Sequence, residues 1–160
     1  MAALFLALLP LPTIAAQVSV EFDESVDFDE FLTYAFREGA DAKRVEVQIR
    51  IEGFIKRELD QRGLMQVEDS PDLVVRTYAL VEKLTLEQLA DETTWEFYTG
   101  LVDMDAYSVR AGTLVIDVAD RSGKTVLWRG LVAAPVTGNV AAVERKLDKA
   151  VTKMFRQFPR

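Results

Sequence analysis

Carboxylates are the side chains whose type and spacing most readily suggest chemistry. Asp103 and Asp105 lie two residues apart, while Asp117 and Asp120 lie within and at the end of a β-prone run. Two carboxylates held in one cleft can act as acid and base in a hydrolase, or can bind a small ligand. The local pattern also allows a structural role, because Asp117 faces outward if its apolar neighbours face a core, and Asp120 suits the first position of a turn. A carboxylate hydrolase or small-ligand binder is therefore the alternative to a non-enzymatic protein.

A second cluster of acidic residues lies between positions 23 and 30 and consists of Asp23, Glu24, Asp27, Asp29 and Glu30. Closely spaced oxygen ligands suit a hard cation such as calcium. The common calcium loop also needs acidic residues at alternating positions and a glycine at its sharp turn, and this run contains no glycine. We interpret the run as a solvated, acidic turn and expect neither a metal site nor a cofactor.

The residue types that the chain lacks exclude many kinds of site. Cysteine and histidine are both absent, which excludes disulfides, thiol nucleophiles, Ser-His dyads and metal sites built on imidazole or thiolate. The sequence also contains no glycine-rich phosphate loop, dinucleotide fingerprint or serine nucleophile elbow. With 26 acidic and 19 basic residues, the net charge of -7 disfavours binding to nucleic acid. These exclusions favour a protein that is not an enzyme.

The sequence Trp128-Arg129-Gly130 is the local cluster most suggestive of binding. Tryptophan and arginine are enriched at the energetic centres of interfaces, and the arginine fork pairs with a carboxylate or phosphate. Neighbouring residues of a strand point to opposite faces. We therefore expect Trp128 in the core beneath a helix and Arg129 at the surface, paired with an acidic neighbour or binding a partner. Gly130 permits a close approach of the backbone to a neighbour, or a bulge.

Two further regions are candidates for partner binding. Residues 85–110 lose clear periodicity but retain Trp95, Phe97, Tyr98 and Tyr107, which could contact a partner or cover the edge of a sheet. Of these, we take Trp95, Tyr98 and Tyr107, together with Arg129, as the candidate partner-binding residues. The last helical segment carries the cations Arg145, Lys146, Lys149, Lys153 and Arg156. They could meet anionic lipid or an acidic partner, or form a solvated face diluted by Glu144 and Asp148.

The hydrophobic periodicity predicts an α+β fold. Strands are expected at residues 18–22, 31–36 and 73–81, and a hairpin at 112–132 with its turn at 120–123. Amphipathic helices are expected at residues 44–62, stopped by Gly63, and from residue 140 to Phe158, ended by Pro159. Gly53 lies inside the first helix, where we expect it to permit a close contact with the sheet. The predicted architecture is a mostly antiparallel sheet of about five strands, with two helices packed on one face.

The first 16 residues resemble a secretory signal peptide. An apolar stretch of about ten residues is followed by small residues, which suits cleavage after Ala15 or Ala16 and is too short for a membrane span. No lysine or arginine precedes the stretch, and a buried terminal element is the other interpretation, although Pro10 and Pro12 would interrupt it. We predict a signal peptide at residues 1–16 and one domain at residues 17–160. An uncleaved terminus would instead attach the chain to a membrane.

Four segments together resemble the family called domain of unknown function 4136. They are FDEFLTYAF at residues 28–36, SPDLVV at 70–75, GTLVIDVAD with VLWRG at 112–120 and 126–130, and FRQFP at 155–159. The resemblance covers most of the chain from about residue 18 and implies an exported α+β domain of the bacterial envelope with no established activity. Many such proteins are lipoproteins, but this sequence has no cysteine for a lipid anchor. We therefore expect a soluble periplasmic or exported domain that binds an envelope protein or another cell-envelope component.

Overall fold

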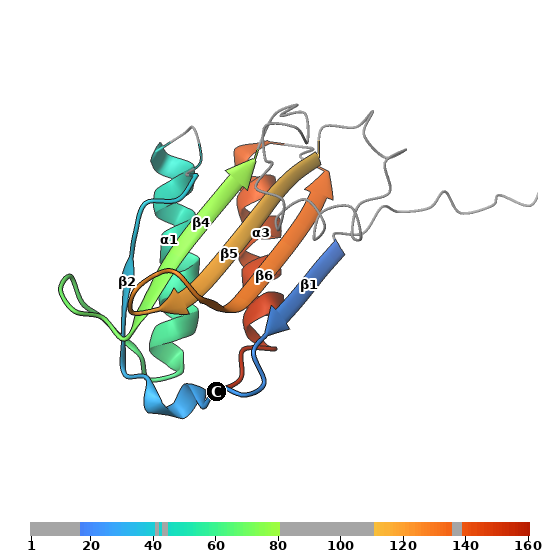
Figure 1. Ribbon diagram of the computed structural model, residues 1–160. Coiled ribbons are helices and arrows are strands. Elements are labelled where there is room, and N and C mark those ends of the chain that lie inside the picture. Colours follow the sequence, from blue (N-terminus) through green and yellow to red (C-terminus); the bar gives the residue numbers. More distant parts are fainter. Residues whose placement is uncertain (1–16, 41, 43–44, 81–110, 136–138) are drawn as a thin grey trace, which may run out of the picture.

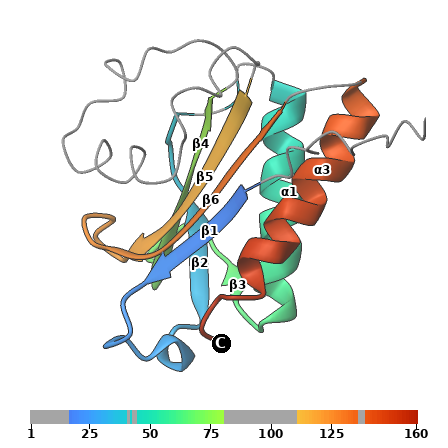
Figure 2. The same cartoon turned by 90° about the vertical axis from the view of Figure 1, so that its right-hand side faces the viewer.

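The computed structural model describes residues 17–40, 42, 45–80, 111–135 and 139–160. These residues form a six-stranded sheet with the order β1-β6-β5-β4-β2-β3. Both long helices lie side by side on one face of this sheet (Figures 1 and 2). The strands are β1 (Gln17–Phe22), β2 (Thr33–Phe36), β3 (Met65–Gln66), β4 (Leu73–Leu80), β5 (Ala111–Asp120) and β6 (Val126–Pro135); the helices are the short 3-10 helix η1 (Phe28–Glu30), α1 (Val45–Gln61) and α3 (Val140–Phe155).

The sheet is mixed, which corrects part of the predicted architecture. Strands β1, β6, β5 and β4 pair in antiparallel fashion, but β2 pairs in parallel with both β4 and β3. The cause is the path of the chain, because α1 carries it back over the sheet between β2 and β4, as a parallel connection requires. The α+β class and the two helices on one face are confirmed, while the described residues form six strands and the sheet is only partly antiparallel.

The main core lies between the sheet and the helices. Trp128 of β6 is fully buried, and its ring lies 4.9 Å from that of Phe155 and 5.4 Å from that of Phe158. The prediction that Trp128 lies in the core beneath a helix is therefore confirmed. On the side of α1, the residues Ile51, Ile55 and Leu59 are buried at the helical spacing expected of an amphipathic helix.

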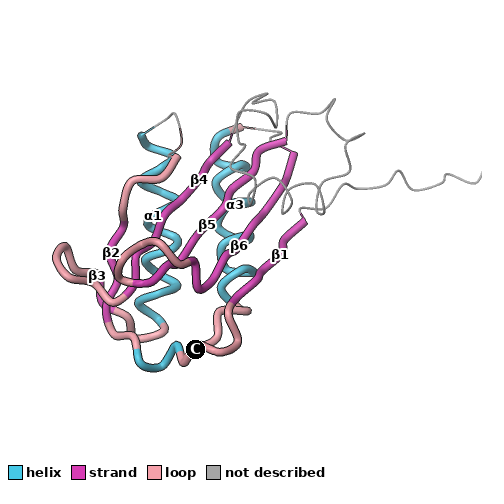
Figure 3. Tube along the Cα trace, viewed as in Figure 1, coloured by secondary structure: helices cyan, strands magenta, loops and turns pink. Residues whose placement is uncertain are grey.

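The hairpin and the bounds of the helices follow the predictions closely, with one difference. Strands β5 and β6 form the predicted hairpin (Figure 3). Their register shifts between Val118 and Ala119, close to the turn. Helix α1 is followed by Gly63, whose φ of 80° is the left-handed conformation typical of a helix end. Helix α3 ends at Phe155 rather than at Phe158. The turn after it returns Phe158 to the core, where its ring lies 5.2 Å from that of Phe28.

Two glycines differ in what surrounds them. The predicted contact of Gly53 with the sheet is wrong, because Gly53 is exposed and a Cβ added there would meet nothing within 4 Å. Gly130 does allow a close approach, since an added Cβ would lie 2.6 Å from Cη2 of Trp128 and 2.8 Å from Sδ of Met154. Gly53 lies two residues from the buried Ile51 and Ile55, which places it on the opposite, exposed side of the helix.

The predicted signal peptide at residues 1–16 lies outside the described residues. Strand β1 begins at Gln17, the first residue of the predicted domain. Among the described residues, no helix has both the length and the apolar composition needed to cross a membrane.

Candidate functional site

Arg129, the one predicted binding residue that the structure describes, lies in a row of charges across the sheet. Arg76 of β4 is the register partner of Asp117 in β5, which is itself the partner of Arg129 in β6. Arg129 in turn is opposite Glu21 of β1. Because paired residues of neighbouring strands project to the same face, these side chains alternate in charge on the face opposite the helices.

Asp117 and Arg129 form a two-point ion pair. Nε of Arg129 donates to Oδ1 of Asp117 at 2.6 Å, and Nη2 donates to Oδ2 at 2.6 Å. The Asp117 side chain is 5% exposed and that of Arg129 is 21% exposed. The prediction that Arg129 pairs with an acidic neighbour is confirmed. Asp117 points away from the core that Leu114, Ile116 and Val118 enter, as predicted, but it is buried rather than exposed on that side.

The burial of this second face could not be predicted from alternation alone. Val115 and Leu131 face the same side as Asp117 and are 4% and 2% exposed. A strand pattern assigns side chains to two faces but does not show whether the second face meets water. Burial also raises the pKa of the nearby Tyr78 hydroxyl, and the negative charge of Asp117 adds to this effect.

The ion pair limits what Asp117 can do chemically. Both carboxylate oxygens of Asp117 accept hydrogen bonds from Arg129, so neither is left free of this contact to bind a substrate. Two nitrogens of Arg129 are likewise engaged. A partner that used Arg129 would have to share or displace this contact, and its role in partner binding stays a prediction.

Asp117 and Asp120 do not form a catalytic pair. They lie three residues apart on β5 and so project to opposite faces. Oδ1 of Asp120 accepts hydrogen bonds from Oγ of Ser122 at 2.8 Å and from the backbone N–H of Lys124 at 3.1 Å. These bonds confirm Asp120 as the first residue of a turn, and the bond from Ser122 is the main reason that its pKa is lowered. Asp103 and Asp105 lie outside the described residues, so a site built on them stays a prediction.

A hollow of about 490 Å³ lies beside this turn and is lined by Phe31, Asp72, Asp120, Arg121 and Ser122. Oδ2 of Asp72 accepts from the backbone N–H groups of Leu32 and Thr33, both at 3.0 Å, while Nη2 of Arg121 donates to Oδ1 at 2.8 Å. The hydrogen bond from Leu32 is the largest cause that holds the pKa of Asp72 at about 2. Asp72 therefore ties β4 to the start of β2 and is not poised as a base.

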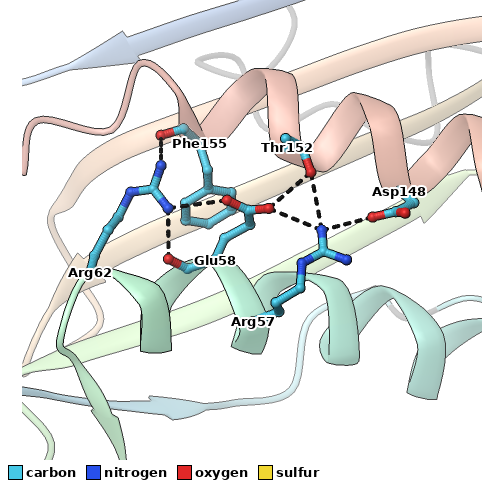
Figure 4. Close-up of polar contacts among 6 residues, drawn as sticks. All are labelled: Arg57, Glu58, Arg62, Asp148, Thr152 and Phe155. Atoms are coloured by element: carbon cyan, nitrogen blue, oxygen red, sulfur yellow. Dashed lines mark hydrogen bonds and ion pairs between the residues drawn. The ribbon is translucent and has the colours of Figure 1, made fainter.

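A dense polar network that no sequence pattern predicted lies between the two helices (Figure 4). Glu58 of α1 is only 5% exposed. Its carboxylate accepts from Arg57 at 3.0 Å, from Arg62 at 3.1 Å and from the Thr152 hydroxyl of α3 at 2.9 Å. Arg57 also donates to Asp148 of α3 at 2.7 Å, and Arg62 donates to the backbone carbonyl of Phe155.

This network joins α1 to α3 rather than forming a reactive site. Burial by itself would raise the pKa of Glu58, but hydrogen bonds from Arg57, Thr152 and Arg62 together outweigh it and lower the pKa. The signal in the sequence is an acidic residue beside the buried Leu59, followed four residues later by Arg62. Helical periodicity marks apolar positions and so overlooks a charge on the buried side.

The acidic run before residue 31 mainly shapes the backbone. Oδ1 of Asp23 accepts from the backbone N–H of Ser25 at 2.9 Å and from its hydroxyl at 2.6 Å. Asp27 caps η1 by accepting from the backbone N–H of Asp29 at 3.0 Å. In the described part of the chain, no three acidic side chains are grouped so that they could hold a metal ion.

The aromatic candidates Trp95, Tyr98 and Tyr107, with their neighbour Phe97, lie outside the described residues. Their contribution to binding stays a prediction.

Comparison with known proteins places this architecture in a family. The sequence model of DUF4136, a domain of unknown function, matches residues 18–160. The chain belongs to the DUF4136 family. This confirms the resemblance carried by the four segments, which span almost the whole matched region. A search of curated proteins found no match.

Two solved structures resemble the fold of this DUF4136 chain. A PDZ domain protein from Parabacteroides distasonis matches with a TM-score of 0.61 and 19% identity, over 90% of this chain and 36% of that one. The chain thus spans about a third of that protein. A PelC dodecamer from Paraburkholderia phytofirmans matches with a TM-score of 0.53 and 8% identity, over 88% of this chain and 95% of that one. At these identities the likeness shows the fold alone.

Proposed function

We propose that this DUF4136 chain is an exported, non-enzymatic binding domain of the bacterial envelope, and that its partner is an envelope protein or another envelope component. Three features support the proposal: the signal-like first 16 residues, the family, and the structural use of the described carboxylates Asp72, Asp117 and Asp120. PelC, which has a similar fold, is a dodecamer, so the fold is compatible with extensive contacts between proteins.

The observation that carries the proposal is the edge strand β1. It is the outermost strand on one side of the sheet and pairs with β6 alone among the described strands (Figure 3). The backbone N–H of Asp23 donates to the Leu127 carbonyl at 2.9 Å. Hydrogen-bonded and non-bonded pairs alternate in an antiparallel ladder. The backbone groups of Val18, Val20 and Phe22 therefore point away from β6.

A strand edge of this kind can accept an extended segment from a partner. Backbone hydrogen bonds then supply affinity, and neighbouring side chains supply specificity. We keep Trp95, Tyr98, Tyr107 and Arg129 as the candidate side-chain contacts. The β1 edge is the main binding surface in this proposal.

Cross-linking in intact cells, followed by mass spectrometry of the proteins captured with an epitope-tagged chain, tests the proposal. Val20→Pro removes an N–H that faces the free edge but leaves the hydrogen bonds to β6, and proline is tolerated at such edge positions. Val20→Thr is the matched control, because it is similar in shape and keeps the N–H. We expect the wild type and Val20→Thr to capture the same envelope protein and Val20→Pro to lose it.

The side-chain candidates are tested in the same experiment. Changing Trp95, Tyr98 or Arg129 to alanine should reduce capture, while circular dichroism checks that each variant is folded. Equal capture by Val20→Pro and the wild type would reject the edge as the binding surface. Capture of nothing above background would reject the binding domain in favour of the small-ligand or hydrolase alternative, with Asp103 and Asp105 as the next residues to change.

A further inference from the structure

The charges of α3 are separated by face. Its two acidic residues both face α1. Oε1 of Glu144 lies 2.6 Å from Nε of Arg50, and Oδ1 of Asp148 lies 2.7 Å from Nη2 of Arg57. In the sequence alone, these two carboxylates could dilute the cations of the helix. They do not, because both are engaged by arginines of α1.

The outward face of α3 is consequently basic along its length. Residues spaced by three and four positions share one side of a helix, and this side lies opposite the buried Ala150, Val151 and Met154. The first and last cations, Arg145 and Arg156, are 11 positions apart, so the helical rise gives a stripe about 17 Å long. The basic stripe consists of five exposed cations: Arg145, Lys146, Lys149, Lys153 and Arg156.

The same chain carries a surface of opposite charge. No lysine or arginine occurs between residues 17 and 36. Two exposed apolar side chains, Phe22 at 41% and Leu32 at 58%, lie within this region. The acidic segment, residues 21–30, holds six exposed carboxylates: Glu21, Asp23, Glu24, Asp27, Asp29 and Glu30.

We propose that the basic stripe of α3 docks on the acidic segment of a second copy of this chain. Within one copy the acidic segment lies below the C-terminal end of α3 rather than along its outward face (Figure 1). It is held there by the pairing of β1 with β6 and by the packing of Phe28 against Phe158 at 5.2 Å between ring centroids. Four cations of the stripe, namely Arg145, Lys149, Lys153 and Arg156, make no ion pair with the described residues and are left for another molecule.

Charge favours a second copy over a lipid surface. The whole chain carries a net charge of -7, and an anionic membrane that approached α3 would also approach the carboxylates beside its end. A second copy instead offers those carboxylates as the complement. Each copy presents both surfaces, so the contact can close as a pair or repeat from copy to copy.

The nature of the contact predicts how it responds to salt. Exposed ion pairs are individually weak and are screened by salt, while Phe22 and Leu32 add the apolar contact that a stable interface needs. We expect sedimentation of the purified protein to give the mass of an assembly of two or more copies at about 20 mM salt, and the mass of a single copy at about 500 mM salt.

Two charge-reversal variants test which surfaces meet. Lys149→Glu/Lys153→Glu reverses part of the stripe, and Glu24→Lys/Glu30→Lys reverses part of the acidic segment. None of these four side chains makes a hydrogen bond or ion pair in the described structure. For each variant alone, the association constant should fall by about tenfold or more, because like charges then face each other. An equal mixture of the two should recover association, because both contacts are again between opposite charges.

Control variants on distant surfaces distinguish a specific contact from a general effect of charge. Lys56→Ala in α1 and Glu68→Lys after β3 change exposed charges outside both surfaces and should leave association unchanged. A wild type that is a single copy at low salt, or a mixture that fails to recover association, overturns the proposal. Binding of phosphatidylglycerol vesicles that is lost only in Lys149→Glu/Lys153→Glu would assign the stripe to lipid instead. None of these variants changes the backbone edge of β1. Loss of self-association in them is therefore distinguishable from loss of the partner binding that Val20→Pro tests.

Discussion

At the scale of single residues, the pair formed by Asp117 and Arg129 shows how the sheet carries charge on its covered face. Both oxygens of the carboxylate are engaged at 2.6 Å, and the carboxylate is nearly inaccessible to water. Removing one charge of such a pair leaves the other desolvated without its partner. Removing either member of the pair should therefore lower the free energy of unfolding, because the remaining buried charge has lost its partner.

Asp117→Asn should lower the free energy of unfolding by about 2 kcal/mol, below the range for a fully buried pair because Arg129 retains some exposure. Urea unfolding at neutral pH measures this change. Lys56→Ala is the control, because it removes the exposed pair with Asp60, and it should change stability by about 0.5 kcal/mol or less. Similar losses in the two variants would show that the buried pair has no special role.

Asp72 predicts a pH dependence with a definite sign. Its pKa lies at about 2 in the folded chain, below the ordinary 3.8. A lowered pKa means that the stabilisation is complete above the ordinary value and is lost as the pH falls from there towards 2. We expect the stability advantage of the wild type over Asp72→Asn to shrink between about pH 4 and pH 2, as measured by urea unfolding at each pH. A constant difference would show that the carboxylate charge does not stabilise the fold.

At the scale of elements, α1 contains a position that can be improved. Gly53 is exposed in the middle of the helix, and an added Cβ would meet open space. Gly53→Ala should raise the free energy of unfolding by about 1 kcal/mol, because alanine loses less backbone entropy in a helix. Thermal and urea unfolding measure the gain.

Gly130→Ala is the contrasting substitution in β6. Its new methyl group would press on Trp128 and Met154, so we expect a loss of about 2 kcal/mol. If both alanine variants shifted stability in the same direction, the surroundings assigned to these glycines would be wrong.

The elements also show which local patterns could be predicted. Helices α1 and α3, strand β4 and the β5–β6 hairpin have strong periodicity or turn residues, and the predictions located them to within a few residues. Strand β3 has only two residues, which is too short for any period to be recognised. The early end of α3 was missed because an apolar position at Phe158 suits either one more helical turn or a chain that folds back into the core.

At the scale of the whole molecule, the predicted signal peptide leads to a test of export. If residues 1–16 direct secretion, the protein recovered from the periplasm should begin at Ala16 or Gln17, because the small residues there suit the signal peptidase. Intact mass measurement and N-terminal sequencing identify the first residue. The matched control is Ala15→Leu/Ala16→Leu, whose large side chains should block cleavage. Recovery of the wild type with residues 1–16 still attached would contradict the prediction and favour membrane attachment.

The site at this scale depends on how separate elements meet. Arg129 and its need for an acidic partner could be inferred from the sequence, but the choice of Asp117 required the register between β5 and β6. The network around Glu58 joins residues more than 90 positions apart, and no local pattern relates them. The basic stripe was visible as a run of cations, but only the packing of α3 on α1 shows that Glu144 and Asp148 are removed from it.

The sequence by itself determined the α+β class, the two amphipathic helices, the hairpin, the family and the lack of cysteine and histidine, because these depend on composition and on short-range order along the chain. Tertiary structure decided the parallel pairing of β2 with β4, the burial of Asp117, the open space around Gly53 and the partners of each carboxylate. The physical reason is that burial and ion pairing depend on which surfaces the folded chain brings together. A period of two or of 3.6 residues gives the direction of a side chain, and only the packed elements determine what that side chain meets.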